Sequence, residues 1–161
     1  MVSSVFKLVL VHAILTGCGQ AVAACAVVPG REFADVETDV KFALRASTAV
    51  FSGKVIAIDY VRAQAVDGEH REAQVVRVAA QSWWKGVSSP TVTLGTENRR
   101  RADGVLSVEA HAYRYEVGKN YLIYAQLEDG RLHANGCTRT KSISAAAGDI
   151  AVLDALTAKH E

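Results

Sequence analysis

Two long β-rich segments, residues 48–60 and 73–84, most constrain the fold of this chain. The first contains Gly53, and a glycine inside a strand indicates a bulge or a sharp bend. In the second, alternate apolar residues from Val76 to Ala80 fall on one face of a strand. Because small barrels turn their corners with strands bent at a glycine, we expect Gly53 to shape a barrel corner rather than a binding groove.

Later segments predict shorter strands and loops. Residues 90–96 alternate outward threonines with Val92 and Leu94, which is typical of a half-buried strand. Residues 97–104 are polar and predict a surface loop. Other expected features are a turn at 67–68, a break at 85–90, an ambiguous stretch at 105–116, a strand at 120–127 and its hairpin partner at 131–134.

Apolar residues at helical spacing predict a helix over residues 32–46 and another over 145–159. The first apolar stripe would contain Phe33, Val36, Val40 and Leu44, and the second Ile150, Leu153 and Leu156. About five strands between two helices predict a mostly β chain, folded as one small closed or partly open barrel. An immunoglobulin-like sandwich is the alternative, but it usually needs about seven short strands.

The first residues have the order of an export signal. A single cation, Lys7, precedes an apolar run over residues 8–15, and small residues follow. The run is too short to span a bilayer as a helix, which takes about 20 apolar residues. We therefore expect an exported protein, periplasmic or extracellular.

The export signal has two competing ends. Leu15-Thr16-Gly17-Cys18 is similar to a bacterial lipobox, in which Cys18 would carry a lipid and begin the mature chain. Ordinary signal peptidase prefers small residues before the cut and would begin the mature chain at Ala24 or Cys25. The predicted division is a signal peptide at 1–24 and one domain at 25–161, with the lipobox ending at Cys18 as the alternative. Only a lipid on Cys18 would attach the protein to a membrane.

The charge of the chain is balanced. It carries 18 Lys and Arg against 17 Asp and Glu, and removal of Lys7 with the signal leaves a neutral domain. General nucleic-acid binding needs clustered positive charge, so we expect no nucleic-acid partner. The basic run at 99–101 is flanked by Glu97 and Asp103 and is expected to be a solvated loop.

Two cysteines remain in the predicted domain. In an oxidising compartment Cys25 and Cys137 are expected to form a disulfide, with two separate thiols as the alternative. The bridge would close a loop of more than 100 residues, and such a loop is worth about 4–5 kcal/mol of chain entropy. It would tie the mature N-terminus to the far end of the domain.

Familiar catalytic and metal-binding patterns are missing from the sequence. The histidines after the export signal stand at 70, 111, 133 and 160, and none shows His-x-x-x-His or Cys-x-x-Cys spacing. Ser82-Trp83-Trp84-Lys85 matches Ser-x-x-Lys, but the Ser-Asp-Asn and Lys-Thr-Gly partners of that motif are missing. We therefore expect no catalytic residue, no metal site and no cofactor, and an envelope enzyme is the least favoured class.

Aromatic pairs indicate which faces of the strands are buried. Trp83 and Trp84 point to opposite faces, so we expect a core tryptophan beside a strand-end tryptophan, with a ligand-stacking platform as the alternative. Tyr121 and Tyr124 also lie on opposite faces, so at least one hydroxyl should reach solvent or a polar partner. Arg139 is expected to hold the chain terminus through hydrogen bonds to carbonyl groups.

Four short motifs follow one another after the cysteine near the mature N-terminus. They are Val-Phe-Ser-Gly-Lys-Val at 50–55, Trp-Lys-Gly at 84–86, Gly-Lys-Asn-Tyr-Leu-Ile-Tyr-Ala at 118–125 and Gly-Cys-Thr-Arg-Thr at 136–140. This order resembles the bacterial relatives of the tissue inhibitors of metalloproteinases, which share a netrin-like module. The resemblance covers nearly the whole mature chain and implies a barrel of the oligonucleotide/oligosaccharide-binding (OB) type.

The resemblance also implies an inhibitory chemistry. In the animal inhibitors, a Cys-x-Cys at the mature N-terminus places the first cysteine's α-amine and carbonyl on the catalytic zinc of the protease. The matching stretch here is Cys25-Ala26-Val27, so the second cysteine is missing, as is a mid-chain cysteine of the family. One bridge, Cys25 to Cys137, is left. Zinc binding by Cys25 would further require a cut immediately before it.

We therefore expect a non-catalytic binding module of the cell envelope, whose partner is an unknown protein or envelope ligand. The alternative is a metalloproteinase inhibitor that binds the zinc of an endopeptidase through Cys25.

Overall fold

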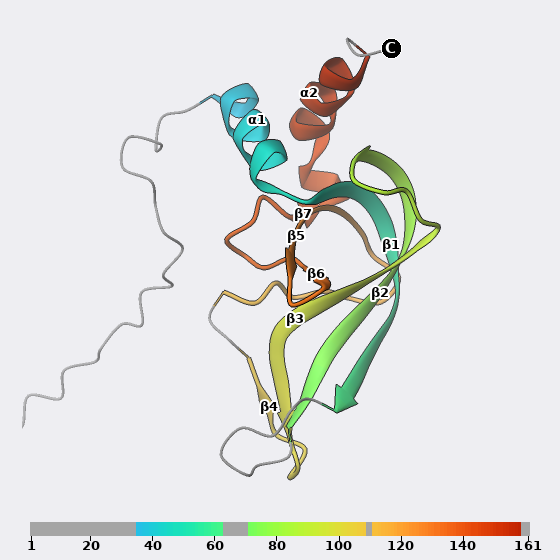
Figure 1. Ribbon diagram of the computed structural model, residues 1–161, viewed down its shortest axis with the longest axis vertical. Helices are drawn as coiled ribbons and strands as arrows, with labels where there is room; N and C mark the ends of the chain where they lie inside the picture. Colours follow the sequence, from blue (N-terminus) through green and yellow to red (C-terminus); the bar gives the residue numbers. More distant parts are fainter. Residues whose placement is uncertain (1–34, 63–70, 109–110, 159–161) are drawn as a thin grey trace, which may run out of the picture.

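The computed structural model describes residues 35–62, 71–108 and 111–158. The described chain is mostly β, with one helix before the strands and one after them, as the sequence predicted. The elements are α1 (Val36–Ala46), β1 (Ala49–Arg62), β2 (Arg71–Lys85), β3 (Thr91–Arg101), β4 (Leu106–Ser107), β5 (Asn120–Glu128), β6 (Arg131–His133), β7 (Lys141–Ser142), a 3-10 helix (Ile143–Ala145) and α2 (Ala147–Thr157). Both α-helices lie at one end of the molecule, and β4 lies at the other (Figure 1).

Five strands pair in a closed cycle. β1 pairs with β2, β2 with β3, β3 with β6, β6 with β5, and β5 again with β1. The β3–β6 pairing is parallel and short, whereas the other pairings of the cycle are antiparallel. The two-residue strands β4 and β7 pair with β3 and β5 at the margin of this cycle. The long early strands and the β5–β6 hairpin that the sequence predicted are therefore present.

Gly53 lies at an irregularity of β1, as predicted. The register between β1 and β2 shifts between Ser52 and Gly53. A Cβ atom on Gly53 would lie 2.6 Å from the carbonyl oxygen of Ala79 and 2.6 Å from Cγ1 of Val78. The close approach of the two strands at this bend therefore requires a residue without a side chain.

Two hydrophobic clusters lie on the two faces of the sheet. Successive residues of β5 alternate between them, because side chains of a strand point to opposite faces. Ile123 belongs to the first cluster with Phe51, and Leu122 belongs to the second. The second cluster also contains Val40 of α1 and Leu153 of α2, both fully buried, so the helices cover that face.

The paired aromatic residues divide between the two clusters. Trp83 packs against the first and stacks on Phe51, with ring centroids 4.7 Å apart. Trp84 packs against the second, and its Nε1–H donates to Asp154 Oδ1 at 2.7 Å. Tyr121 and Tyr124 divide in the same way. The predicted opposite orientation of each pair is confirmed, and each tryptophan has structural contacts.

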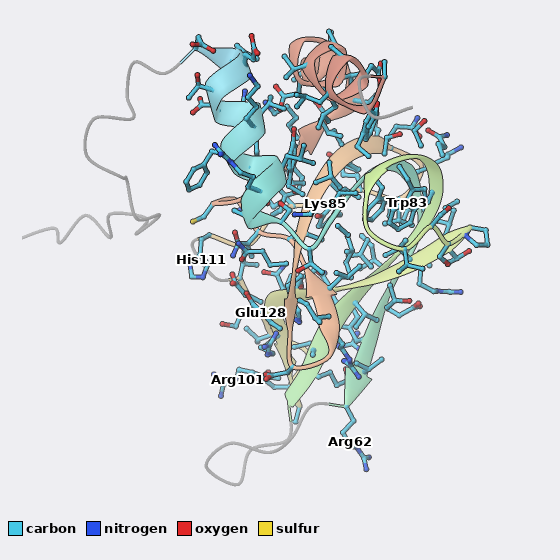
Figure 2. The ribbon with its side chains drawn as sticks, turned by 45° about the horizontal axis from the view of Figure 1, so that its top comes forward. Arg62, Trp83, Lys85, Arg101, His111 and Glu128 are labelled. Carbon is cyan, nitrogen blue, oxygen red and sulfur yellow. The ribbon has the colours of Figure 1, made fainter. Side chains whose placement is uncertain are left out.

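Polar contacts fix both ends of α1. The amide of Thr38 donates to Asp35 Oδ1 at 2.8 Å and caps the first turn. Lys85 Nζ donates to the carbonyls of Leu44 at 2.8 Å and Arg45 at 3.1 Å. This ammonium lies at the C-terminal end of the helix, where the helix dipole favours a cation (Figure 2).

The apolar stripe of α1 is shorter than predicted. Val40 is fully buried and Leu44 is half-buried, but Val36 is 48% exposed. The neighbour of Val36 on α2 is Gly148, which has no side chain to cover it. Phe33 and the turn predicted at 67–68 lie outside the described residues.

The prediction of a surface loop at 97–104 is wrong for residues 97–101, because β3 continues to Arg101, and only residues 102–104 form an exposed turn. Residues 99–101 pair with residues 71–73 of β2. Asn98 Nδ2 donates to Gln74 Oε1 at 2.9 Å, and Arg100 Nε donates to Glu72 Oε2 at 2.7 Å. The polar side chains of this segment are accommodated in a strand because β2 supplies their partners.

Candidate functional site

A pocket of about 460 Å³ is formed by β2, β3, the end of β1 and the β5–β6 hairpin. Its volume falls in the range of about 300–1,000 Å³ that is usual for ligand sites. The lining is mainly apolar. It also contains the hydroxyl side chains of Ser89, Thr91 and Thr93 and the guanidinium of Arg131. Its principal apolar residues are Val75, Trp83, Val87, Val92, Leu127 and Leu132.

The rim of this pocket exposes large apolar side chains. Val87, in the loop between β2 and β3, is 89% exposed, and Leu127 at the end of β5 is 57% exposed. Arg131 is also exposed. Apolar rim residues beside one cation suit a ligand that is largely apolar and carries negative charge.

A tight turn sets the hairpin side of the pocket. Asp129 and Gly130 have φ values of 48° and 75°, the left-handed conformation that two-residue hairpin turns require. This turn places Leu127 opposite Leu132 across the hairpin, and both line the pocket. On the sheet side, the stacking of Trp83 on Phe51 fixes the indole ring.

Cys137 lies exposed in the loop that follows β6. Asn135 shapes this loop, because its Oδ1 accepts hydrogen bonds from the amides of Cys137 at 3.0 Å and Thr138 at 3.2 Å. Cys25 and Cys18 lie outside the described residues. The bridge between Cys25 and Cys137, the zinc-binding role of Cys25 and the lipid on Cys18 therefore stay predictions.

A histidine and a carboxylate stand beside the Cys137 loop. His111 Nε2 lies 2.9 Å from Glu97 Oε2, and Asn135 Nδ2 donates to the other oxygen of Glu97 at 3.1 Å. The amide of Gly136 donates to the carbonyl of His111 at 2.5 Å. These contacts join the loop to β3, so we assign the group a structural role.

His133 is held by packing. A Cβ atom on Gly95 would lie 2.3 Å from Cε1 of His133, so the imidazole ring lies directly against the backbone of β3. In the part of the chain that the structure describes, no three His, Cys, Asp or Glu side chains meet where they could hold a metal ion.

Arg139 binds carboxylates, and the predicted hydrogen bonds to carbonyl groups are not what the structure shows. Its Nε donates to Asp149 Oδ2 at 2.6 Å, and its Nη1 donates to Asp39 Oδ2 at 3.3 Å. Asp149 also accepts from Lys141 and from the hydroxyl of Tyr124. Burial and the nearby Asp149 charge raise the pKa of Tyr124, which keeps its hydroxyl a donor. Arg139 thus links α1 to α2, a structural role as expected.

Comparison with known proteins and families gives no assignment. No protein-family model matches the chain, and no curated protein matches it. Within residues 35–62, 71–108 and 111–158, no helix has the length and apolar character that crossing a membrane would take.

Proposed function

We propose that the protein is an exported, non-catalytic binding module of the cell envelope, whose ligand binds in the pocket between β3 and the β5–β6 hairpin. The observation that carries this proposal is the exposed apolar rim of Val87 and Leu127 beside Arg131. Clusters of exposed apolar side chains on the surface of a folded protein often mark interaction sites. The ligand class is an apolar, negatively charged group of a protein or of an envelope molecule.

The proposed type is a netrin-like module built on an OB-type barrel. Three features support it: a cycle of five paired strands, a bend at Gly53 and a helix that follows the last strand. OB-type barrels are five-stranded and partly open, and they bind ligands on the face of their second and third strands. β2, β3 and the loop between them supply seven of the twelve residues that line the pocket, which agrees with that position.

Metalloproteinase inhibition remains the alternative proposal. It depends on a free α-amine at Cys25, since that amine would have to reach the zinc of the endopeptidase. The loop that presents Cys137 at the surface is consistent with a tethered N-terminus, but it does not distinguish an inhibitor from another binding protein.

We expect a photoreactive p-benzoylphenylalanine at position 87 to capture the ligand in living cells, because this side chain stands at the rim of the pocket. A discrete adduct should appear after irradiation, and mass spectrometry would identify it. Adding Arg131→Glu should reduce the adduct several-fold, since it reverses the charge beside the rim.

The matched control places the same photoreactive residue at position 117. Val117 is 59% exposed and does not line the pocket. Equal adducts from positions 87 and 117, or no adduct from position 87, would refute binding at the pocket.

A further inference from the structure

A second pocket lies between the two α-helices, on the face of the sheet that they cover. Its volume is about 290 Å³, close to the lower limit of about 300 Å³ that is usual for ligand sites. The lining of this helix pocket consists of Lys41, Leu44 and Arg45 of α1, Trp84 of β2, and Leu156 and Thr157 of α2. None of these residues lines the pocket of the proposed function.

Three large apolar side chains form the walls of the helix pocket. Leu44, Trp84 and Leu156 are each only half-buried, so apolar surface between the helices stays in contact with water. The indole of Trp84 has a fixed orientation, because its Nε1–H donates to Asp154 Oδ1 at 2.7 Å. A fixed indole beside two leucines offers a preformed surface for one aromatic ring of a ligand.

Two cations of α1 add positive charge to this apolar lining. Lys41 and Arg45 lie one helical turn apart. Lys41 pairs with Glu37, whereas no carboxylate of the described chain pairs with Arg45. The Arg45 side chain is exposed, and a guanidinium can bind a carboxylate through two parallel N–H donors.

The ends of the helices are occupied by other groups. The carbonyl end of a helix by itself repels an anion. At the end of α1, however, Lys85 Nζ donates to the carbonyls of Leu44 at 2.8 Å and Arg45 at 3.1 Å. At the end of α2, the hydroxyl of Thr157 donates to the carbonyl of Asp154 at 3.0 Å. The side chain of Arg45 is therefore left for a ligand.

We propose that the helix pocket binds a small aromatic carboxylate, with the ring against Trp84 and the carboxylate on Arg45. A neutral ring would leave the guanidinium without a partner, and a cationic ligand would be repelled by Lys41 and Arg45. This proposal does not depend on the proposed function, because Trp83 lines that pocket and Trp84 lines this one.

The two tryptophans give each pocket its own reporter. Phenylacetate titrated into isotope-labelled protein should shift the indole N–H resonance of Trp84 in NMR spectra along a saturable curve, because the bound ring lies against that indole. The Trp83 resonance reports the other pocket separately, and a Trp83→Phe variant assigns the two resonances.

The charge of the ligand and of Arg45 is tested by matched pairs. Arg45→Gln should weaken phenylacetate binding at Trp84 about twofold to fivefold, the range of an exposed ion pair. Phenylacetamide, which lacks the charge, should bind the wild type as weakly as phenylacetate binds the variant. Arg62→Gln is the control, since Arg62 is exposed at the end of the molecule remote from the helices (Figure 2). It should leave the binding curve unchanged.

Three results would each overturn the assignment: an unmoved Trp84 resonance, equal binding of phenylacetate and phenylacetamide, or equal weakening by Arg45→Gln and Arg62→Gln. A Trp84 shift that grows with protein concentration in the absence of phenylacetate would also overturn it, because a second copy of the chain would then occupy the helix pocket. Failure of the cross-link at position 87 would remove the proposed function and leave this proposal standing.

Discussion

Replacing Asp149 with alanine should lower the free energy of unfolding by about 3–5 kcal/mol, the usual loss when one partner of a buried ion pair is removed. The Asp149 side chain is 4% exposed and accepts hydrogen bonds from Arg139 Nε at 2.6 Å and Lys141 Nζ at 3.1 Å. Its removal leaves two cations close together without their carboxylate. Because Arg139 also contacts Asp39 of α1, we expect the packing of both helices to weaken together. Urea unfolding followed by circular dichroism measures the loss.

Asp59→Ala is the matched control for this substitution. Asp59 also accepts from an arginine Nε, that of Arg77 at 2.9 Å, but both side chains are about half exposed. Exposed pairs contribute about 0.2–1 kcal/mol. Equal losses in Asp149→Ala and Asp59→Ala would contradict the structural role of the Asp149 group.

The same carboxylate should make stability depend on pH. Burial alone would raise the pKa of Asp149, but the hydrogen bonds and charges of Arg139 and Lys141 hold that pKa below its usual value. A carboxyl with a lowered folded-state pKa stabilises the fold above its unfolded-state pKa of about 3.9. That contribution is lost as pH falls through the lower folded-state pKa. The stability difference between the wild type and Asp149→Asn should therefore be full near neutral pH and shrink in acid.

Gly53→Ala should destabilise the protein by about 2–3 kcal/mol, because an added methyl group would overlap the backbone of β2. The carbonyl oxygen of Ala79 would lie 2.6 Å from the new Cβ atom, and backbone cannot move aside as a flexible side chain can. Thermal and urea unfolding would both record the loss.

Gly148→Ala, the same change in α2, should have the opposite sign. Its new Cβ atom would lie 3.7 Å from Cγ1 of Val36, an ordinary contact. Alanine is favoured over glycine in helices, so we expect a gain of up to about 0.5–1 kcal/mol. A neutral Gly53→Ala would show that the bend does not need a glycine.

Elements with a strong local pattern could be predicted from the sequence. β5 and the central part of α1 contain apolar residues at regular spacing, and the structure places both close to the predicted bounds. The second half of β3 could not be found in this way. Thr96 and Asn98 are polar but buried, because Gln74 of β2 lies beside them and accepts hydrogen bonds from both side chains. Such a partner comes from a distant segment, and composition within 97–104 does not reveal it.

The proposed binding pocket was harder to predict than the strands. The pocket joins Val87, Leu127 and Arg131 from three separate segments, and none of them stands in a recognisable motif. One sign of the pocket was present in the sequence. The loop at 85–90 contains an isolated valine that fits neither a helical nor a strand pattern, and the structure leaves this valine exposed. Arg139 was predicted to be structural, but its carboxylate partners lie on both helices and could not be foreseen.

The start of the mature chain decides between the two proposed functions. A free amine at Cys25 would keep metalloproteinase inhibition open. A lipid on Cys18, or a start at Ala24, would exclude zinc binding by that amine and favour the binding module.

The central claim, that the chain is exported as a bridged binding module, is tested most directly by the intact mass of the protein from its native cells before and after reduction. We expect a chain that has lost at least residues 1–17 and gains two hydrogen atoms on reduction, as Cys25 and Cys137 separate. A chain that keeps Met1, or a mass that reduction leaves unchanged, would contradict the claim.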